Sequence, residues 1–169
     1  MRDAPSFDEF YRATAARTLR YAVVVVGDHG EAQDAVQEAY ARAWRRWETV
    51  ADHPAPEAWV RLVISRLATD RWRRLGGLAG ALRRSGPPPT APPPSENTVV
   101  LVAALRDLPA NHRRALALHY LCDLSVEQIS AETGAGTNTV KSWLARGRER
   151  LAAVLTETDT DTDLGVRDA

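Results

Sequence analysis

The sequence predicts an all-α protein made of two small helical domains joined by a linker. Apolar residues recur at helical spacing in two separate stretches, no stretch alternates as a strand would, and a run rich in proline and glycine separates the two. With 169 residues, of which 44% are hydrophobic, the chain can build two compact cores, but each must be small.

The separating run, residues 76–95, reads GGLAGALRRSGPPPTAPPPS and holds six of the ten prolines and four of the ten glycines. This composition is typical of a semi-stiff tether. The last fourteen residues are acidic and nearly devoid of apolar groups, so we expect them to be disordered. The expected organisation is therefore a first domain over residues 5–75, a linker over 76–98, a second domain over 99–155 and an acidic tail over 156–169.

Three helices are expected in the first domain. Their apolar residues recur every three or four positions over residues 5–26, 31–47 and 57–75, with a proline-containing loop over 48–56. The second helix is amphipathic, since Val36 and Tyr40 share one side while Asp34 and Glu38 lie on the other. In the third helix, Arg66, Thr69 and Arg73 fall on one face, which predicts a basic surface.

The second domain begins near Val99, and Pro109 starts a helix whose apolar residues include Leu116, Leu118, Tyr120 and Leu121. Ser125 and Gln128 have the spacing of a capping box, so a short helix should begin at Ser125. Residues 133–136, TGAG, should end it, and a longer helix should follow over 137–155 with Val140, Leu144 and Leu155 inward.

These last two helices have the form of a helix-turn-helix: a short capped helix, a glycine-bearing turn, and a longer helix that begins with small polar residues. On the longer helix, Asn138, Ser142 and Ala145 point outward and can approach base edges. Lys141, Arg146 and Arg148 lie where phosphates would run. DNA binding is therefore the favoured interpretation, although two short helices at a glycine turn are also a common packing arrangement.

Charge is unevenly distributed although the formal net charge is zero. Residues 57–84 hold seven arginines against two acids, whereas residues 156–169 hold five acids against one arginine. A basic block of this kind faces a polyanion or an acidic partner. The arginine-rich composition also fits a GC-rich genome.

No stretch approaches the roughly 20 apolar residues of a membrane-spanning helix. The first residues are charged and amphipathic, unlike a signal peptide, so we expect a cytoplasmic protein. Cys122 has no second cysteine to pair with and is expected to be a small buried thiol.

The segment LRDLPANHRRALALHYLCDLSVEQISAETGAGTNTVKSWLARGRERL resembles the promoter-binding fourth region of extracytoplasmic-function sigma factors, of the sigma-70 family and actinobacterial type. The resemblance implies that the helix-turn-helix binds the minus-thirty-five element, through Thr137, Asn138, Thr139, Lys141, Ser142, Arg146 and Arg148. Trp143 stands where that family usually has arginine.

The first domain resembles the same family independently, because GDHGEAQDAVQEAYARAWRRW is similar to its second region. The resemblance implies docking on the clamp helices of core RNA polymerase through Asp34, Gln37, Glu38 and Arg42. It also implies capture of the unpaired minus-ten strand by the third helix and its preceding loop, through Arg61, Arg66, Thr69, Arg73 and Arg74. Basic side chains beside aromatic ones, here Trp59 and Trp72, are typical of single-strand binding, although both indoles are more often packing residues. Arg66 stands where the family commonly has asparagine.

The function implied is that of a non-enzymatic sigma factor, which binds core RNA polymerase and confers promoter recognition and melting in transcription initiation. Promoter DNA and an anti-sigma protein are the other implied partners. No cofactor, metal or small-molecule substrate is implied.

Three alternatives stay open at this stage. A stand-alone helix-turn-helix regulator would explain the second domain but leave the first unexplained. The polar face of the second helix could be an ordinary solvated surface with a Glu38–Arg42 pair. An enzyme lacks support, because no glycine-rich phosphate loop or histidine triad is present, and His119 with Cys122 is the nearest approach to a metal pair.

Overall fold

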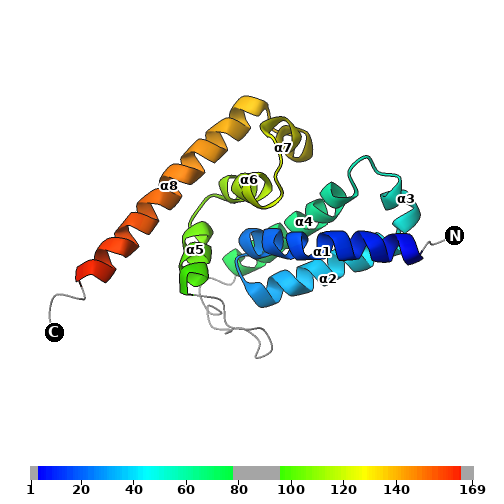
Figure 1. Cartoon of the computed structure of the whole chain (residues 1–169), viewed down its shortest axis with the longest axis horizontal. Helices are drawn as coiled ribbons and strands as arrows, with labels where there is room; N and C mark the ends of the chain where they lie inside the picture. Colours follow the sequence, from blue (N-terminus) through cyan, green and yellow to red (C-terminus); the bar gives the residue numbers. More distant parts are fainter. Residues whose placement is uncertain (1–3, 78–95, 165–169) are drawn as a thin grey trace. The chain divides into compact units, whose positions relative to one another are not determined.

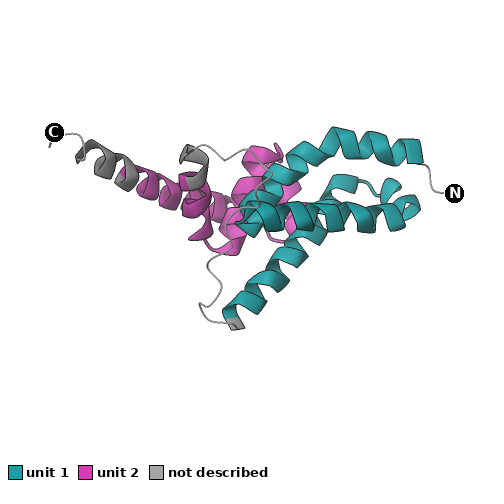
Figure 2. Ribbon diagram, turned by 90° about the horizontal axis from the view of Figure 1, so that it is seen from below, with its two compact units in different colours: residues 1–92 teal, residues 93–169 magenta. Residues whose placement is uncertain are grey.

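The computed structural model describes residues 4–77 and 96–164, which form helices joined by short turns (Figure 1). The chain divides into two compact units, residues 1–92 and 93–169 (Figure 2), and each is described by itself. The prediction of an all-α fold with two helical domains is confirmed. Most of the predicted linker, residues 78–95, lies outside the described residues.

Unit 1 contains α1 (Ala4–Val26), α2 (His29–Arg45), α3 (Trp47–Ala51) and α4 (Pro56–Gly77). The three long helices pack against one another, as Figure 1 shows. Each contributes a stripe of apolar or small residues at helical spacing, and burial of these stripes stabilises the bundle. The core includes Tyr21, Ala22, Val36, Ala39, Val60 and Ile64.

Hydroxyl groups are also buried in this core and tie α1 to its neighbours. Tyr40 Oη lies 2.7 Å from Thr14 Oγ1 and 3.0 Å from Thr18 Oγ1, and Tyr21 Oη lies 2.7 Å from Ser65 Oγ. Burial raises the pKa of Tyr40 above its ordinary value. Because buried polar groups must be paired, these bonds specify how the helices face one another as well as that they associate.

Helix α3 corrects the prediction of a continuous loop over residues 48–56. The backbone leaves helical geometry at Arg46, with φ −121° and ψ 24°, so α2 ends two residues before the predicted Trp47. This break allows Trp47 to turn toward α1, where its ring lies 5.1 Å from those of Phe7 and Phe10, and its Nε1 donates to Ser6 Oγ at 3.2 Å. Only residues 52–55 connect α3 to α4.

Unit 2 contains α5 (Glu96–Arg106), α6 (Ala110–Leu121), α7 (Val126–Thr133) and α8 (Thr137–Leu164). Its core is largely aliphatic, with Leu105, Leu108, Leu116, Leu118, Ile129, Val140 and Leu144 buried. Helices α6 and α8 approach closely at Gly147, since a Cβ there would lie 2.9 Å from Leu116 Cδ1. A larger residue at position 147 would therefore force the Leu116 side chain to shift.

Two side-chain predictions for unit 2 are corrected. Tyr120, expected among the apolar residues of α6, is 55% exposed, and Leu155, expected inward, is 38% exposed. Disorder was expected from Thr156, but α8 continues as helix to Leu164. Extending an existing helix needs no new nucleus, and no glycine or proline interrupts the sequence from Arg148 to Leu164.

The edges of the expected linker also move. Gly76 and Gly77 close α4, and residues 96–98 belong to the first turn of α5. Among the helices of the described ranges, none is long and apolar enough to cross a membrane.

Candidate functional site

The polar face of α2 is formed as predicted. Asp28 caps the helix by accepting a hydrogen bond from the Glu31 backbone N–H at 2.9 Å. Asp34, Gln37 and Arg42 are exposed and Glu38 is partly so. Because the Asp28 cap stabilises the start of α2 and the apolar side of the helix is buried, these polar side chains are held on the solvent-facing side.

The Glu38–Arg42 pair, considered in the sequence as a simple surface feature, is present. Arg42 Nε donates to Glu38 Oε1 at 2.6 Å. This hydrogen bond holds the pKa of Glu38 below its ordinary value. Exposed pairs of this kind add little stability, so breaking this pair to bind a partner would cost little free energy.

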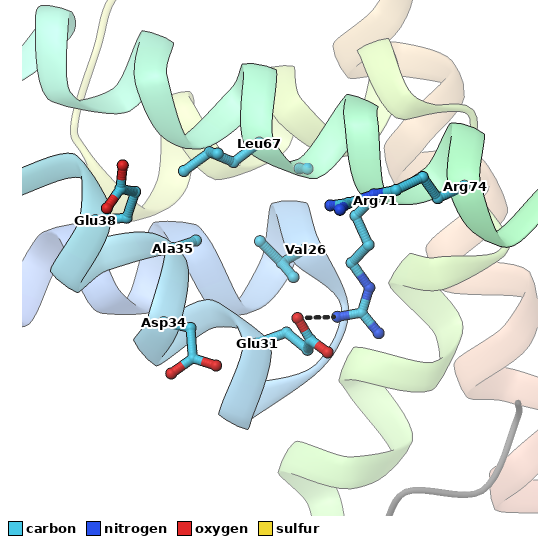
Figure 3. A pocket seen from close by; sticks show the side chains of 9 residues that line it. Val26, Glu31, Asp34, Ala35, Glu38, Leu67, Arg71 and Arg74 are labelled. Carbon is cyan, nitrogen blue, oxygen red and sulfur yellow. Dashed lines mark ion pairs between the residues drawn. The ribbon is translucent and has the colours of Figure 1, made fainter.

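A groove lies between α2 and α4, beside this face (Figure 3). Val26, Ala35 and Leu67 are among its apolar lining residues. Its acidic side chains come from α2, namely Glu31, Asp34 and Glu38, and its basic ones from α4, namely Arg71 and Arg74. The groove thus brings together two of the predicted polymerase contacts and one of the predicted strand contacts, Arg74.

The pair that bridges the groove was missed in the sequence. Arg71 Nη1 lies 3.2 Å from Glu31 Oε2 across the two helices. The residues are 40 positions apart, so no local spacing could have revealed the contact. Arg71 is consequently a link between α2 and α4, consistent with its side chain being only 23% exposed.

Arg61 does not belong to the exposed basic surface, which corrects its predicted role as a minus-ten contact. It is 5% exposed, and its Nη1 lies 3.3 Å from Glu57 Oε2. The same carboxylate accepts two hydrogen bonds from Arg17 of α1, at 3.0 and 2.6 Å. A buried guanidinium held by a carboxylate is part of the helix packing and cannot reach DNA without breaking it.

The other predicted strand contacts are exposed on α4: Arg66, Thr69, Arg73 and Arg74. Thr69 Oγ1 donates to the Ser65 backbone carbonyl at 2.9 Å, which leaves its oxygen available only as an acceptor while that bond is kept. Arg73 is loosely paired with Asp70 at 3.9 Å. Trp72 is 40% exposed beside this set.

The helix-turn-helix in unit 2 is formed with the predicted signals. Ser125 Oγ accepts from the Gln128 backbone N–H at 3.2 Å, and Gln128 Oε1 accepts from the Ser125 backbone N–H at 2.8 Å. Gly134 ends α7 with φ 75°, a conformation that favours glycine. The turn is closed further by Ser130 Oγ, which donates to the Ala135 carbonyl at 2.6 Å.

The residues predicted to contact the minus-thirty-five element lie in the first half of α8. Thr137, Asn138, Thr139 and Lys141 are exposed, Ser142 and Trp143 are half-buried, and Arg146 and Arg148 are exposed. Val140 and Leu144 are buried behind them. This placement gives α8 one polar side free to enter a groove of duplex DNA, with basic residues on both flanks.

Two neighbours of this surface on α6 were missed in the sequence. Tyr120 Oη accepts a hydrogen bond from Arg148 Nη1 at 3.2 Å. Burial, followed by the positive charges of Arg146 and Arg150, lowers the pKa of His112. Both residues come from a different helix, so only the tertiary packing reveals them.

His119, the candidate metal ligand, has a different partner. Its Nδ1 lies 2.8 Å from the Leu124 backbone carbonyl. Because a carbonyl can only accept, Nδ1 must carry the proton in this contact. Within residues 4–77 and 96–164, no three histidine, cysteine or acidic side chains are grouped as a metal site.

Comparisons with known proteins agree for both units. The family model described as Sigma-70 region 2 matches residues 10–77, and that described as Sigma-70, region 4 matches residues 98–151. The RNA polymerase sigma-E factor of Streptomyces coelicolor is 31% identical over 163 residues, covering 95% of this chain and 92% of the relative. The ECF RNA polymerase sigma factor SigL of Mycobacterium tuberculosis is 32% identical over 154 residues, covering 87% of each.

Solved structures show the same fold. The sigma factor RpoE of Bartonella quintana, solved in complex with the anti-sigma factor NepR, has a TM-score of 0.71 at 24% identity, covering 88% of this chain and 97% of that one. CnrH, solved in complex with the cytosolic domain of CnrY, has a TM-score of 0.64 at 20% identity, covering 92% and 90%.

Proposed function

Because the chain belongs to the extracytoplasmic-function group of the sigma-70 family, we propose that α2 docks on core RNA polymerase and that α4 and α8 contact promoter DNA. As a sigma factor it acts in transcription initiation, with core polymerase and promoter DNA as partners. The division of labour among its helices is the part proposed.

One observation carries this proposal. In each unit, helices whose apolar sides are buried expose a polar surface, and the two surfaces have different chemistry. Unit 1 offers the acidic face of α2 beside the exposed arginines of α4. Unit 2 offers a capped helix-turn-helix with basic flanks. A plain DNA-binding regulator needs only the second of these.

For unit 1 we propose that Asp34, Gln37, Glu38 and Arg42 contact polymerase. Arg66, Thr69, Arg73 and Arg74 then contact the unpaired minus-ten strand. Arginine suits both tasks, since its planar guanidinium binds phosphate and stacks on bases. Arg61 is left out because it is buried against Glu57.

For unit 2 we propose that the start of α8 reads the minus-thirty-five element as duplex. Thr137, Asn138, Thr139 and Ser142 offer small hydrogen-bonding groups to base edges, while Lys141, Arg146 and Arg148 offer positive charge to phosphates. Joined by the segment between the units, two weak contacts on one promoter can add to a specific complex.

An anti-sigma protein is the further partner we propose. Two solved structures of similar fold were determined with such a protein or with a cytosolic partner domain. The groove between α2 and α4 combines apolar and charged side chains of both signs, which suits a protein partner. We propose no catalytic chemistry for the chain and place it in the cytoplasm, where polymerase acts.

The decisive experiment is reconstitution with core polymerase on a panel of promoter fragments. We expect the complete chain to co-purify with core polymerase and to direct transcription from a subset of promoters. We expect the chain alone to bind duplex DNA poorly, because its formal net charge of zero gives little long-range attraction. Nanomolar, sequence-specific binding without polymerase would instead favour a stand-alone regulator.

A further inference from the structure

Tyr120 at the end of α6 has an unusual environment for a residue in an apolar stripe. It is 55% exposed, yet its hydroxyl is engaged by Arg148 of α8 at 3.2 Å. The hydroxyl of Tyr120 therefore meets α8 at Arg148 while much of the tyrosine side chain stays exposed.

The contact between the two helices fixes this arrangement. Leu116, one turn before Tyr120, lies against Gly147, where even a Cβ would come within 2.9 Å of Leu116 Cδ1. The next residue of α8, Arg148, therefore lies within reach of Tyr120. A helix crossing without an intervening side chain leaves little freedom to slide.

The tyrosine ring is itself supported. The ring of His119 meets it edge to face, with centroids 4.8 Å apart and planes at 81°. His119 is in turn held by the contact of its Nδ1 with the Leu124 carbonyl, at 2.8 Å. Leu124 immediately precedes Ser125, the cap of α7, so the support for Tyr120 is built from the helix-turn-helix itself.

The chemistry of the contact differs from that of the other arginine contacts described. Arg42 and Arg71 face carboxylates, which offset their charge. Tyr120 is a neutral acceptor and uses one of the five N–H donors of Arg148. The guanidinium is restrained while its positive charge and its other donors stay available to a second acceptor.

Arg148 also lies in a suitable place on α8. It follows Lys141 by seven residues, or two helical turns, so the two exposed basic side chains share one flank of the reading surface. Asn138 and Ser142 lie on the surface beside that flank. A duplex read by Asn138 and Ser142 would bring a strand of phosphates along the flank.

We propose that Tyr120 is a positioning residue that holds the guanidinium of Arg148 toward a backbone phosphate of duplex DNA. This inference rests on the proposed function of unit 2 in duplex binding. Restraining a long side chain before binding removes part of the entropy cost of the contact. Tyr120 thus raises affinity for every sequence through Arg148, without contributing charge.

A double-mutant cycle tests this in holoenzyme assembled from the complete chain and core polymerase. Binding of promoter duplex is measured at several salt concentrations for Tyr120→Phe, Arg148→Gln and both together. Tyr120→Phe should weaken binding about two- to tenfold, the scale of ordering one long side chain on binding, with an unchanged salt slope because Arg148 keeps its charge. Arg148→Gln should lower the magnitude of the salt slope by about 0.9, and adding Tyr120→Phe should then have no further effect.

Tyr11→Phe is the matched control, since Tyr11 is a 45% exposed tyrosine of unit 1, and it should bind as the parent does. An unchanged affinity for Tyr120→Phe, or the same loss in the Arg148→Gln background, overturns the positioning role. Arg146→Gln separates this failure from that of the proposed function. If that variant lowers the salt slope while Tyr120→Phe does nothing, duplex binding by unit 2 stands and only the role of Tyr120 falls.

Discussion

The two units use their arginines differently. In α4 of unit 1, Arg61 and Arg71 are held by Glu57 and Glu31 and tie helices together. In α8 of unit 2, Arg148 is held by the neutral hydroxyl of Tyr120 and keeps its charge for a second partner. The difference teaches that the number of arginines on a helix does not measure its capacity to bind nucleic acid. Whether an arginine can bind nucleic acid depends on the group that its guanidinium already contacts.

The largest expected effect tests the structural role of charge in unit 1. Glu57→Ala should lower the free energy of unfolding by about 2–4 kcal/mol, because it removes the carboxylate that lies against the buried guanidinium of Arg61 and also breaks the Arg17–Glu57 ion pair. Glu38→Ala is the matched control, since it removes an exposed pair and should leave stability unchanged. Urea denaturation followed by circular dichroism measures the stability of both variants. Equal losses in the free energy of unfolding would contradict the difference proposed between internal and surface pairs.

The next effect concerns the reading surface of unit 2. Asn138→Ala or Ser142→Ala should reduce the discrimination between bases at one upstream position by about 1–3 kcal/mol. A lost base-edge hydrogen bond affects only the sequences that offered it. Arg146→Gln should weaken all upstream sequences about equally and lower the salt slope by about one unit. Transcription from a promoter panel at several salt concentrations measures both. An unaltered preference profile in a folded Asn138 or Ser142 variant would show that α8 does not read sequence.

A somewhat smaller effect is expected on the docking face of unit 1. Reversing charge with Asp34→Lys and Glu38→Lys should weaken association with core polymerase by about tenfold or more, because complementary charge becomes repulsive. Helix content should not change, since Asp34 is exposed and Glu38 nearly so. Asp8→Lys with Glu9→Lys reverses two exposed acids of α1 and is the control for net charge. If the two double variants bound core polymerase with equal affinity, the polar face of α2 would be an ordinary solvated surface.

The smallest expected effect is a pH dependence of stability caused by His112, which lies near the basic residues Arg146 and Arg150 of unit 2. The pKa of His112 lies below its ordinary value of 6.5, first because of burial and then because of Arg146 and Arg150. Between the two values the unfolded state binds more protons, so stability is lost as the pH falls through this window and is fully present above it. Thermal melting between pH 7.5 and about 5.5 should show this loss, and His112→Gln should reduce it. An identical pH dependence in the variant would mean that the loss arises elsewhere.

Sequence patterns predicted the features that depend on neighbouring residues. The capping box at Ser125, the turn at Gly134 and the outward placement of Asn138 all follow from local chemistry and are confirmed. The short helix α3 was not predicted, because the break at Arg46 has no glycine or proline to mark it. It follows instead from the packing of Trp47 against α1.

Long-range pairs account for most of what the sequence did not reveal at the candidate site. Glu57 stands four residues before Arg61, so their contact was visible in principle, but Arg17 joins them from 40 positions away. Tyr120 and Arg148 are separated by 28 residues. Periodicity indicated that Tyr120 shares a stripe with Leu116, but it could not show that Tyr120 is left exposed beside Arg148.

The continuity of α8 has a consequence for how the charges of the chain act on DNA. From Arg146 to Leu164 the helix runs without interruption, and the two ends of this segment lie about 27 Å apart. That length is roughly three Debye lengths at physiological salt, so charge at the far end of the rod has almost no influence at the reading end. The zero formal net charge of the chain therefore limits its attraction to DNA at long range, whereas at contact distance the exposed basic residues Lys141, Arg146 and Arg148 dominate the local field.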